Sequence, residues 1–291
     1  MLLTIVTCGK NDDYCGNFKQ RLTNNLTKLI DNIEKSGKDS VEIIVTDWGS
    51  EVPLSDVLGI KSKFIKYVHV TPELALKYNP HTPFSLPHSL NVGARKASGD
   101  FIFYVDGDAF IPFESYVGVY ELLESNINKD IFFWGARYEI PYRLHSNSTC
   151  YQDIDNEIQK WISSEKTTWE PPQHTGAGPL RSNVDINNFG GGAMGLLVSK
   201  KIAIESTGWW EIFNRWGFMD IEIHHRLSTR FNCNGELEAT IGSEFYHQNH
   251  WELSSGLQTY GANPAQISQN FEANGENWGL GSEELKIIIN D

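Results

Sequence analysis

Two carboxylates flank a single glycine in Asp106-Gly107-Asp108, directly after the most hydrophobic run of the chain, residues 101–105. Charged groups at the end of a buried strand do not stay in the core, so both carboxylates should lie together at the edge of a sheet. Carboxylate oxygens grouped in this way suit Mn²⁺ or Mg²⁺, and such an ion commonly takes phosphate oxygens as further ligands. An ordinary Asp-Gly turn is the alternative interpretation. The continuous apolar run before the motif favours a metal site.

Further acidic residues and histidines stand late in the sequence. Asp220 and Glu222 begin a predicted helix at residues 220–230. There they serve either as reactive carboxylates or as solvated charges that stabilise the first helical turn. His247 and His250 are three residues apart, so one helical turn places both imidazoles on the same side. Taken alone they are ordinary surface histidines, whereas a carboxylate site upstream makes them candidate metal ligands.

The elements that must position these residues follow an α/β pattern. Short apolar runs at residues 2–7, 41–46 and 64–70 predict buried strands, and leucines and isoleucines at helical spacing predict a helix at 17–35. This order predicts a Rossmann-like, mostly parallel central sheet flanked by helices, which binds ligands at the carboxyl ends of its strands. Further helices are expected at 89–97, 115–125 and 220–230, further strands at 101–105, 131–134 and 193–198, and loops around a short helix at 145–188.

Composition narrows the choice of partners. The 291 residues are 40% hydrophobic, which suffices for a globular domain, and 37 acidic residues oppose 24 basic ones. With a net charge of -13 and no cluster of Lys or Arg, general nucleic-acid binding is not expected. An acidic protein that holds a diphosphate needs a cation to offset the repulsion.

Two absences in the sequence bear on where the protein works. No apolar stretch reaches the roughly 18 residues of a transmembrane helix, so no transmembrane segment is expected. The four cysteines lack metal-type spacing and are expected to be reduced thiols. These features predict a cytoplasmic protein. Peripheral association with the inner face of the membrane is compatible with this prediction.

Several motifs resemble those of family 2 glycosyltransferases of the GT-A fold. Residues 94–108 resemble the central segment of that family, in which a helix, a glycine turn and a hydrophobic strand lead to an Asp-x-Asp motif. Asp47-Trp48-Gly49-Ser50 resembles the family's Asp-Asp-Gly-Ser segment, and residues 216–222 resemble its Trp-Gly-x-Glu-Asp-x-Glu segment. Residues 90–93 and 189–192 resemble the β-galactosyltransferase branch. The resemblance covers roughly residues 2 to 250 and implies a GT-A fold.

The resemblance implies roles on the donor side of a nucleotide-sugar site. Asp108 would ligate a metal ion that bridges the donor diphosphate, with Asp106 near the ribose or a metal-bound water, and His247 would complete the metal shell. Asp47 would hydrogen-bond the base, commonly uracil, with Thr7 beside it. Further donor-binding residues are expected within the matching motifs, namely Arg95, Gly191, Gly192 and Glu222.

On the acceptor side, the resemblance implies that Asp220 is the catalytic base and that Trp216 stacks on a sugar ring. Met219 departs from the family pattern, because a Glu that helps to hold the acceptor usually occupies this position. Leu86 stands where the β-galactosyltransferase branch tends to have a donor-binding Arg. A single base on the face opposite the leaving group predicts inversion at the anomeric carbon.

The sequence therefore predicts a metal-dependent, inverting glycosyltransferase that moves a hexose or N-acetylhexosamine from a UDP-sugar to a glycan hydroxyl. A single domain is expected, with a nucleotide-binding half at 1–110, an acceptor and catalytic half at 111–250, and a C-terminal tail at 251–291. One alternative is a nucleotidyltransferase, which would need a Gly-rich, basic phosphate loop after the first strand. Residues 7–10 contain only one glycine and one lysine. The other is an inactive, carbohydrate-binding protein of transferase-like fold, which Met219 favours.

Overall fold

The computed structural model describes residues 1–12, 14–146, 148, 150–166, 195–215, 217–250 and 262–290. Its strands are β1 (Leu3–Gly9), β2 (Val41–Trp48), β3 (Ile65–Val70), β4 (Phe101–Val105), β5 (Ala109–Phe110), β6 (Phe132–Gly135), β7 (Tyr138–Ile140), β8 (Gly195–Ser199), β9 (Gly235–Glu236), β10 (Tyr246–Gln248) and β11 (Lys286–Ile289). Its α-helices are α1 (Phe18–Ser36), α2 (Leu54–Leu58), α3 (Pro72–Tyr78), α4 (Leu86–Lys96), α5 (Phe113–Glu124), α6 (Tyr142–His145), α7 (Tyr151–Ser163), α8 (Lys200–Glu205), α9 (Met219–Ser228) and α10 (Leu237–Ile241).

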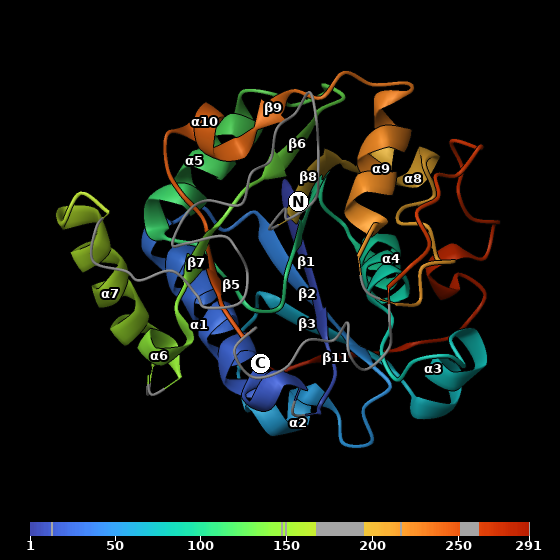
Figure 1. Ribbon diagram of the computed structural model, residues 1–291, viewed down its shortest axis with the longest axis horizontal. Helices are drawn as coiled ribbons and strands as arrows, with labels where there is room; N and C mark the ends of the chain where they lie inside the picture. Colours follow the sequence, from blue (N-terminus) through green and yellow to red (C-terminus); the bar gives the residue numbers. More distant parts are fainter. Residues whose placement is uncertain are drawn as a thin grey trace.

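A large, mostly parallel sheet forms the centre of the molecule, which confirms the predicted α/β fold (Figure 1). Its strand order is β11-β3-β2-β1-β4-β8-β6-β9, and β3, β2, β1 and β4 run parallel to one another. Every residue of β1, β2 and β4 is buried. Strands covered on both faces need continuous apolar runs rather than alternation, which explains why these three were evident in the sequence.

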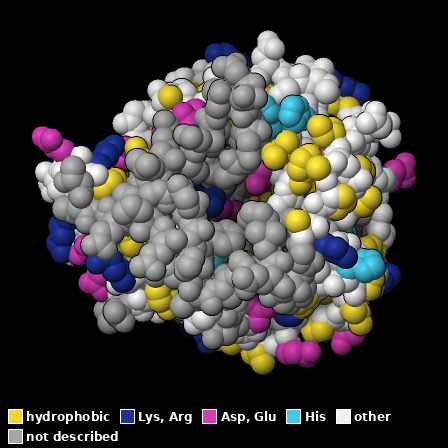
Figure 2. All heavy atoms as spheres, viewed as in Figure 1, with side chains coloured by type: hydrophobic (Ala, Val, Ile, Leu, Met, Phe, Trp, Pro, Cys, Tyr) yellow, Lys and Arg dark blue, Asp and Glu magenta, His cyan; other side chains and the backbone are white. Residues whose placement is uncertain are grey.

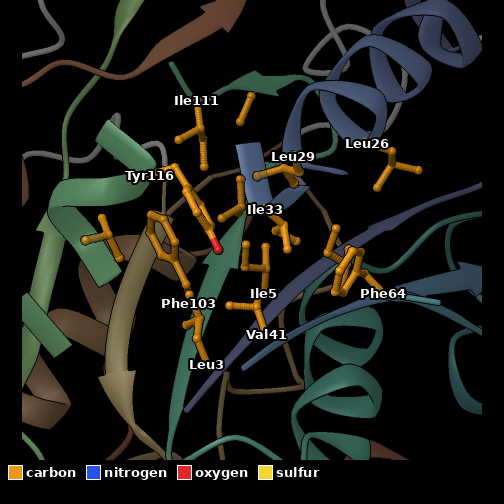
Figure 3. Close-up of a cluster of buried hydrophobic side chains, with 14 of the residues drawn as sticks. Leu3, Ile5, Leu26, Leu29, Ile33, Val41, Phe64, Phe103, Ile111 and Tyr116 are labelled. Carbon is orange, nitrogen blue, oxygen red and sulfur yellow. The ribbon is translucent and has the colours of Figure 1, made fainter. Parts of the chain in front are cut away.

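Helices cover both faces of this sheet. Alternate residues of β1 point to opposite sides, so Ile5 packs with α1 and α5 whereas Val6 packs with α4, α8 and α9. On the α1 side, Leu22, Leu26, Leu29 and Ile33 are 0% exposed (Figure 3). Burial of each such side chain contributes about 1.5–3 kcal/mol. The predicted helix at 17–35 thus has its apolar face against the sheet.

The strand order reverses at β1. The connection from β1 leads to β2 on one side, whereas β4, which follows β3 in the chain, pairs with β1 on the other side. In open α/β sheets such a reversal opens a crevice at the carboxyl edge, where ligands bind. Asp106, Gly107 and Asp108 directly follow β4 at this edge.

A second, three-stranded sheet lies beside this edge, and no pattern in the sequence predicted it. Its order is β5-β10-β7, with His247 of β10 paired to Ala109 on one side and to Glu139 on the other. Paired residues on neighbouring strands carry their side chains on the same face. This register brings His247 and Glu139 together next to the loop that carries Asp108.

The C-terminal segment returns to the N-terminal part of the large sheet. β11 pairs antiparallel with β3 and becomes an edge strand of the large sheet. Trp278 and Leu280 pack into the core on the α4 side. Among the described residues, no helix has both the length and the apolar character that a membrane crossing requires.

Close packing of α4 on β1 predicts a stability effect at Gly93. A Cβ atom there would lie 2.4 Å from Val6 Cγ1, inside a fully buried contact. We expect Gly93→Ala to lower the free energy of unfolding by about 1–3 kcal/mol, the usual cost of overpacking, as measured by urea denaturation. Gly275→Ala is the control, since a Cβ at Gly275 meets nothing within 4 Å. Equal midpoints for both variants would contradict the packing of α4.

Candidate nucleotide and metal site

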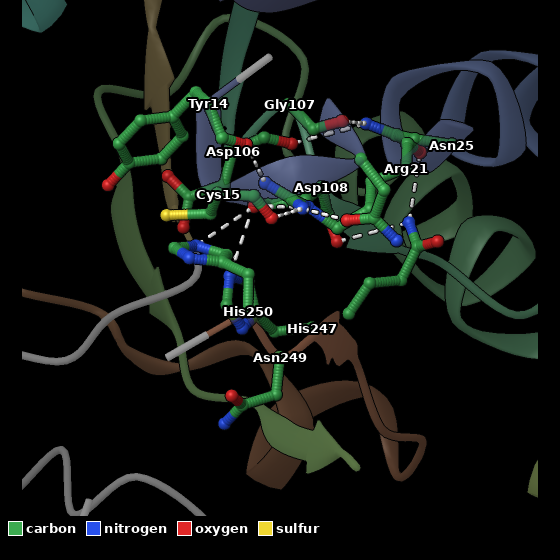
Figure 4. Close-up of polar contacts among 12 residues, drawn as sticks. Tyr14, Cys15, Arg21, Asn25, Asp106, Gly107, Asp108, His247, Asn249 and His250 are labelled. Atoms are coloured by element: carbon green, nitrogen blue, oxygen red, sulfur yellow. Dashed lines mark hydrogen bonds and ion pairs between the residues drawn. The ribbon is translucent and has the colours of Figure 1, made fainter. Parts of the chain in front are cut away.

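Asp108 is the centre of a polar cluster at the carboxyl edge of the large sheet (Figure 4). Its side chain is 9% exposed, with Oδ1 3.1 Å from His247 Nε2 and Oδ2 3.2 Å from His250 Nε2. One ligand atom from each of these three residues lies within 4.8 Å of the other two. The structure therefore brings Asp108 and His247 together, and His250, the other histidine considered as a candidate ligand, lies with them.

Protonation states in this cluster depend on one another. Burial opposes ionisation of Asp108, but His247 and His250 outweigh burial and hold the pKa of its carboxyl well below the usual range. Burial also disfavours the imidazolium of His247, yet Glu139 and Asp108 raise the pKa of His247 to about 9. Protonated His247 thus balances the buried carboxylates. A metal ion bound by His247 would have to displace this proton.

Glu139 holds His247 from the side opposite Asp108. Glu139 Oε2 lies 2.7 Å from His247 Nδ1 and accepts from Asn249 Nδ2 at 3.2 Å, while Oε1 accepts from Arg137 Nε at 2.9 Å. Burial opposes its ionisation, but His247 and Arg137 lower the pKa of Glu139 to about 2. Arg137 also reaches Asp106, with 3.2 Å between Nη1 and Oδ2. A continuous polar network therefore joins Asp106 to His247.

The polar face of α1 supports the site from below. The fully buried Arg21 places Nε 3.4 Å from Asp108 Oδ2, and its guanidinium donates to the carbonyl of Tyr14 at 3.2 Å. Asn25 Nδ2 donates to the carbonyl oxygens of Asp106 at 3.1 Å and Gly107 at 3.2 Å. Because these contacts hold both backbone and carboxylate, the Asp106–Asp108 loop has a fixed position relative to the sheet.

Asp106 and Asp220 are less deeply buried than Asp108 and repel each other electrostatically. The Asp106 side chain is 34% exposed. Burial raises the pKa of Asp106 to about 7, although Arg137 opposes this shift. Burial likewise raises the pKa of Asp220 to about 6, again against the attraction of Arg137. Asp220 also acts electrostatically on Asp106. The predicted base therefore lies near the predicted donor site, and its raised pKa suits general base chemistry near neutral pH.

Asp47 and Thr7 lie below the crevice. Asp47 is 1% exposed. Its carboxylate accepts from Ser50 Oγ and from Leu54 N at 2.8 Å, and one oxygen lies 3.0 Å from His69 Nδ1. These contacts organise the loop after β2, whereas direct bonding of Asp47 to a base stays a prediction. Thr7 is fully buried in β1, and among the described residues Thr7 Oγ1 has no hydrogen-bond partner.

Glu222 and Arg95 are not brought to the crevice. Glu222 is fully buried in α9 and forms an ion pair with Arg226, with 2.7 Å between Oε1 and Nε. Arg226 in turn donates to three backbone carbonyl groups, those of Ser206, Phe271 and Gly208. The exposed Arg95 donates to the carbonyl of Glu276 at 3.1 Å and stacks over Trp278. Both side chains therefore hold the fold together on the α4 and α9 side of the sheet.

Three predicted residues, Gly191, Gly192 and Trp216, lie outside the described residues. Met219, the departure from the family pattern, is 6% exposed and packs in the core with Ile223 and Leu227. Its side chain fills the space between α9 and the sheet. The methionine that stands here in place of a carboxylate therefore has a packing role in this chain.

Four residues of the site, Arg21, Asn25, Arg137 and Glu139, belong to none of the motifs in the sequence. A signal existed for the first two, because Arg21, Asn25, Lys28 and Asn32 form a polar stripe at helical spacing. No comparable signal exists for Arg137 and Glu139. They stand in or beside β7, a strand of three residues, which is too short for a recognisable alternation.

The residues around Asp108 fit a divalent metal ion. A carboxylate and two imidazoles form a mixed oxygen and nitrogen set that Mn²⁺ and other first-row metals accept. The Nδ1 atom of His247 meets a carboxylate, an arrangement that metal-binding histidines usually show. Three protein ligands also leave positions for ligands from a substrate. Asp108, His247 and His250 are thus the residues that would hold the ion.

Known structures with this fold include crystal structures of S. aureus TarS. TarS 1–349 matches with a TM-score of 0.52 and 15% identity, covering 85% of this chain and 60% of that chain. The complex of TarS 1–349 with UDP matches with a TM-score of 0.51 and 14% identity, covering 86% of this chain and 61% of that chain. The complex with UDP-GlcNAc matches with a TM-score of 0.50 and 13% identity, covering 88% of this chain and 62% of that chain. The chain thus spans about 60% of the length of these TarS chains. No family model and no curated protein matches the sequence. The likeness shows a common fold, the GT-A fold.

The buried ion pair of Glu222 predicts a structural effect rather than a binding effect. Removal of one partner leaves an uncompensated buried charge, so we expect Glu222→Ala to cost about 3–5 kcal/mol of stability, measured by thermal and urea unfolding. Glu34→Ala, on an exposed position of α1, is the control and should change stability by less than about 0.5 kcal/mol. A stable Glu222→Ala protein that fails to bind nucleotide would instead favour the predicted donor contact.

Proposed function

We propose that the chain is a metal-dependent glycosyltransferase that transfers a sugar from a UDP-sugar to a hydroxyl group of a glycan. The observation that carries this proposal is the cluster of Asp108, His247 and His250 at the reversal of strand order in a GT-A fold. TarS, which shares this fold, has been crystallised with UDP and with UDP-GlcNAc. UDP-hexose and UDP-N-acetylhexosamine are therefore the donors we propose, as in the β-galactosyltransferase branch that the sequence resembles.

A pocket beside the loops that follow β1 and β2 suits the base of the donor. It has a volume of about 180 Å³ and lies between the loops after β1 and β2 and α3, with Lys10, Gly49, Glu51 and Asn79 among its lining residues. This volume is smaller than that of a complete ligand site, so we assign only the uracil to it. The diphosphate would then extend from this pocket toward Asp108.

The chemistry that we propose needs a departing diphosphate and an activated hydroxyl. A bound divalent ion stabilises the negative charge that develops on the diphosphate. The acceptor oxygen bonds to the anomeric carbon while the bond from that carbon to the diphosphate oxygen breaks, and its electron pair leaves with UDP. Asp220 takes the proton of the acceptor hydroxyl. Because Asp220 would act from the face opposite the diphosphate, we propose inversion.

Apolar side chains beside Asp220 offer a surface for the acceptor. Figure 2 shows apolar side chains gathered over α9, next to a hollow at whose bottom charged side chains of both signs are visible. Ile212 is 51% exposed, and Phe218 and Ile221 are partly exposed. Aromatic and apolar side chains stack well on the flat apolar faces of sugar rings. A glycan acceptor is therefore the class that this surface favours.

Calorimetry with UDP tests the donor site. We expect the chain to bind UDP in the presence of Mn²⁺, and Asp108→Ala to abolish this binding because it removes the central carboxylate. Two imidazole ligands favour Mn²⁺ over Mg²⁺, which prefers oxygen ligands and keeps its waters, so Mg²⁺ should support UDP binding more weakly. His225→Ala, an exposed histidine on α9, should leave binding unchanged.

Three results of calorimetry would count against the proposal. Preference for nucleoside triphosphates over UDP would indicate a nucleotidyltransferase. Binding of glycans without any nucleotide binding would indicate a carbohydrate-binding protein. Equal UDP binding by the Asp108→Ala variant would remove the metal site from the proposal.

A pH profile and one isosteric substitution test the base. Because the pKa of Asp220 is raised to about 6 and a base must be deprotonated to act, kcat/KM for transfer should fall as pH decreases through about 6 and level off above it. Asp220→Asn should keep metal-dependent UDP binding and lose transfer by about 10²–10⁴-fold. Asp100→Asn, at the exposed opposite end of β4, is the matched control. Full turnover by Asp220→Asn would exclude this residue as the base.

A further inference from the structure

Glu139 lies outside every motif in the sequence, yet it contacts the segments that carry two of the three candidate ligands. We infer that Glu139 is the positioning residue of the metal site: through one buried carboxylate it orients the His247 imidazole directly and the His250 segment through Asn249. This inference rests on the proposed function, because it concerns the same metal site. It adds to that site a residue that touches neither metal nor substrate.

The first support is the register of the small sheet. His247 pairs directly with Glu139 between the parallel strands β10 and β7, so both side chains lie on one face. Glu139 Oε2 is 2.7 Å from His247 Nδ1, and His247 Nε2 on the other side of the ring is 3.1 Å from Asp108 Oδ1. A carboxylate at Nδ1 keeps the proton on that nitrogen. Nε2 is then free to donate its lone pair to a metal ion.

The second support is the contact with Asn249, the residue before His250. Asn249 Nδ2 donates to Glu139 Oε2 at 3.2 Å, and its backbone N–H donates to the carbonyl of Ile140 at 3.1 Å. The Asn249 carbonyl lies 2.8 Å from His145 Nε2. These contacts hold the chain just after β10. They keep His250 Nε2 within 3.2 Å of Asp108 Oδ2.

The third support is that a neutral amide cannot replace this carboxylate. Glu139 accepts from Arg137 Nε through one oxygen and from the His247 and Asn249 side chains through the other. A carboxylate accepts at both oxygens, whereas an amide presents one oxygen and one NH₂ donor group. In Glu139→Gln, the NH₂ group would face either Arg137 or His247, both of which donate. The substitution keeps the shape of the side chain but removes its negative charge together with this double acceptance.

Titration of the full chain with Mn²⁺ by calorimetry tests the inference. We expect Glu139→Gln to weaken Mn²⁺ binding by about 10–100-fold, the usual effect of losing such an outer partner. Glu244→Gln is the matched control, since Glu244 stands just before β10, the strand that carries His247, and accepts from Tyr246 Oη at 2.8 Å. The control should bind Mn²⁺ as the unaltered chain does.

A spectroscopic readout separates positioning from a general effect on the fold. Electron spin echo measurements on bound Mn²⁺ detect coupling to imidazole nitrogen, and this coupling should weaken in Glu139→Gln at saturating Mn²⁺. Glu139→Asp keeps both acceptor oxygens on a shorter side chain and should recover part of the affinity. It also serves as the second variant if Glu139→Gln does not fold.

The outcomes are distinguishable from failure of the proposed function. If Asp108→Ala loses Mn²⁺ binding while both Glu139 variants keep the affinity and nitrogen coupling of the unaltered chain, the metal site stands and this inference is wrong. If the unaltered chain binds no Mn²⁺, the proposed metal-dependent function itself fails. Weakened binding with weakened nitrogen coupling in the folded Glu139 variants supports the positioning role.

Discussion

The structure of this site depends on the need to balance the buried charge of Asp108. An unpaired carboxylate at this depth would cost several kcal/mol, so its position is possible only where cationic partners meet it. Arg21 of α1 contacts the Asp108 carboxylate from one segment, and His247 and His250, at and after β10, contact it from another. Segments far apart in the chain are therefore held at one point, and that point is where a divalent ion would be bound.

Each of the two sheets contributes a different part of this site. The large sheet supplies the crevice at the reversal of strand order between β1 and β4, a feature shared by open α/β folds in general. The small sheet β5-β10-β7 supplies what is particular to this chain, because its register aligns His247 with Glu139 and adjoins the Asp108 loop. Because Glu139 and Asp108 raise the pKa of His247 to about 9, its imidazolium provides positive charge beside Asp108. Metal binding should therefore release protons.

Asp220 and Glu222 show how environment assigns different roles to similar side chains. Both lie in the first turn of α9, two residues apart. Glu222 points inward and is fixed by Arg226, which also holds three carbonyl groups, so its charge is used to join segments of the fold. Asp220 has no such ion pair among the described contacts, and burial raises its pKa to about 6. One carboxylate is thus structural and the other is suited to proton transfer.

The sequence by itself determined six strands of the large sheet, the helices α1, α4, α5 and α9, and the place of the Asp106–Asp108 loop. Continuous apolar runs for doubly covered strands and apolar residues at helical spacing are local signals. The same signals could not reveal β5, β7 or β10, which have two or three residues each and exist only because they pair with one another. Tertiary structure alone decided that Glu139 meets His247, that Arg21 is buried against Asp108 and that Glu222 turns away from the crevice. These outcomes depend on pairing a buried charge across long separations in the chain, and no local pattern of residue types records such a pairing.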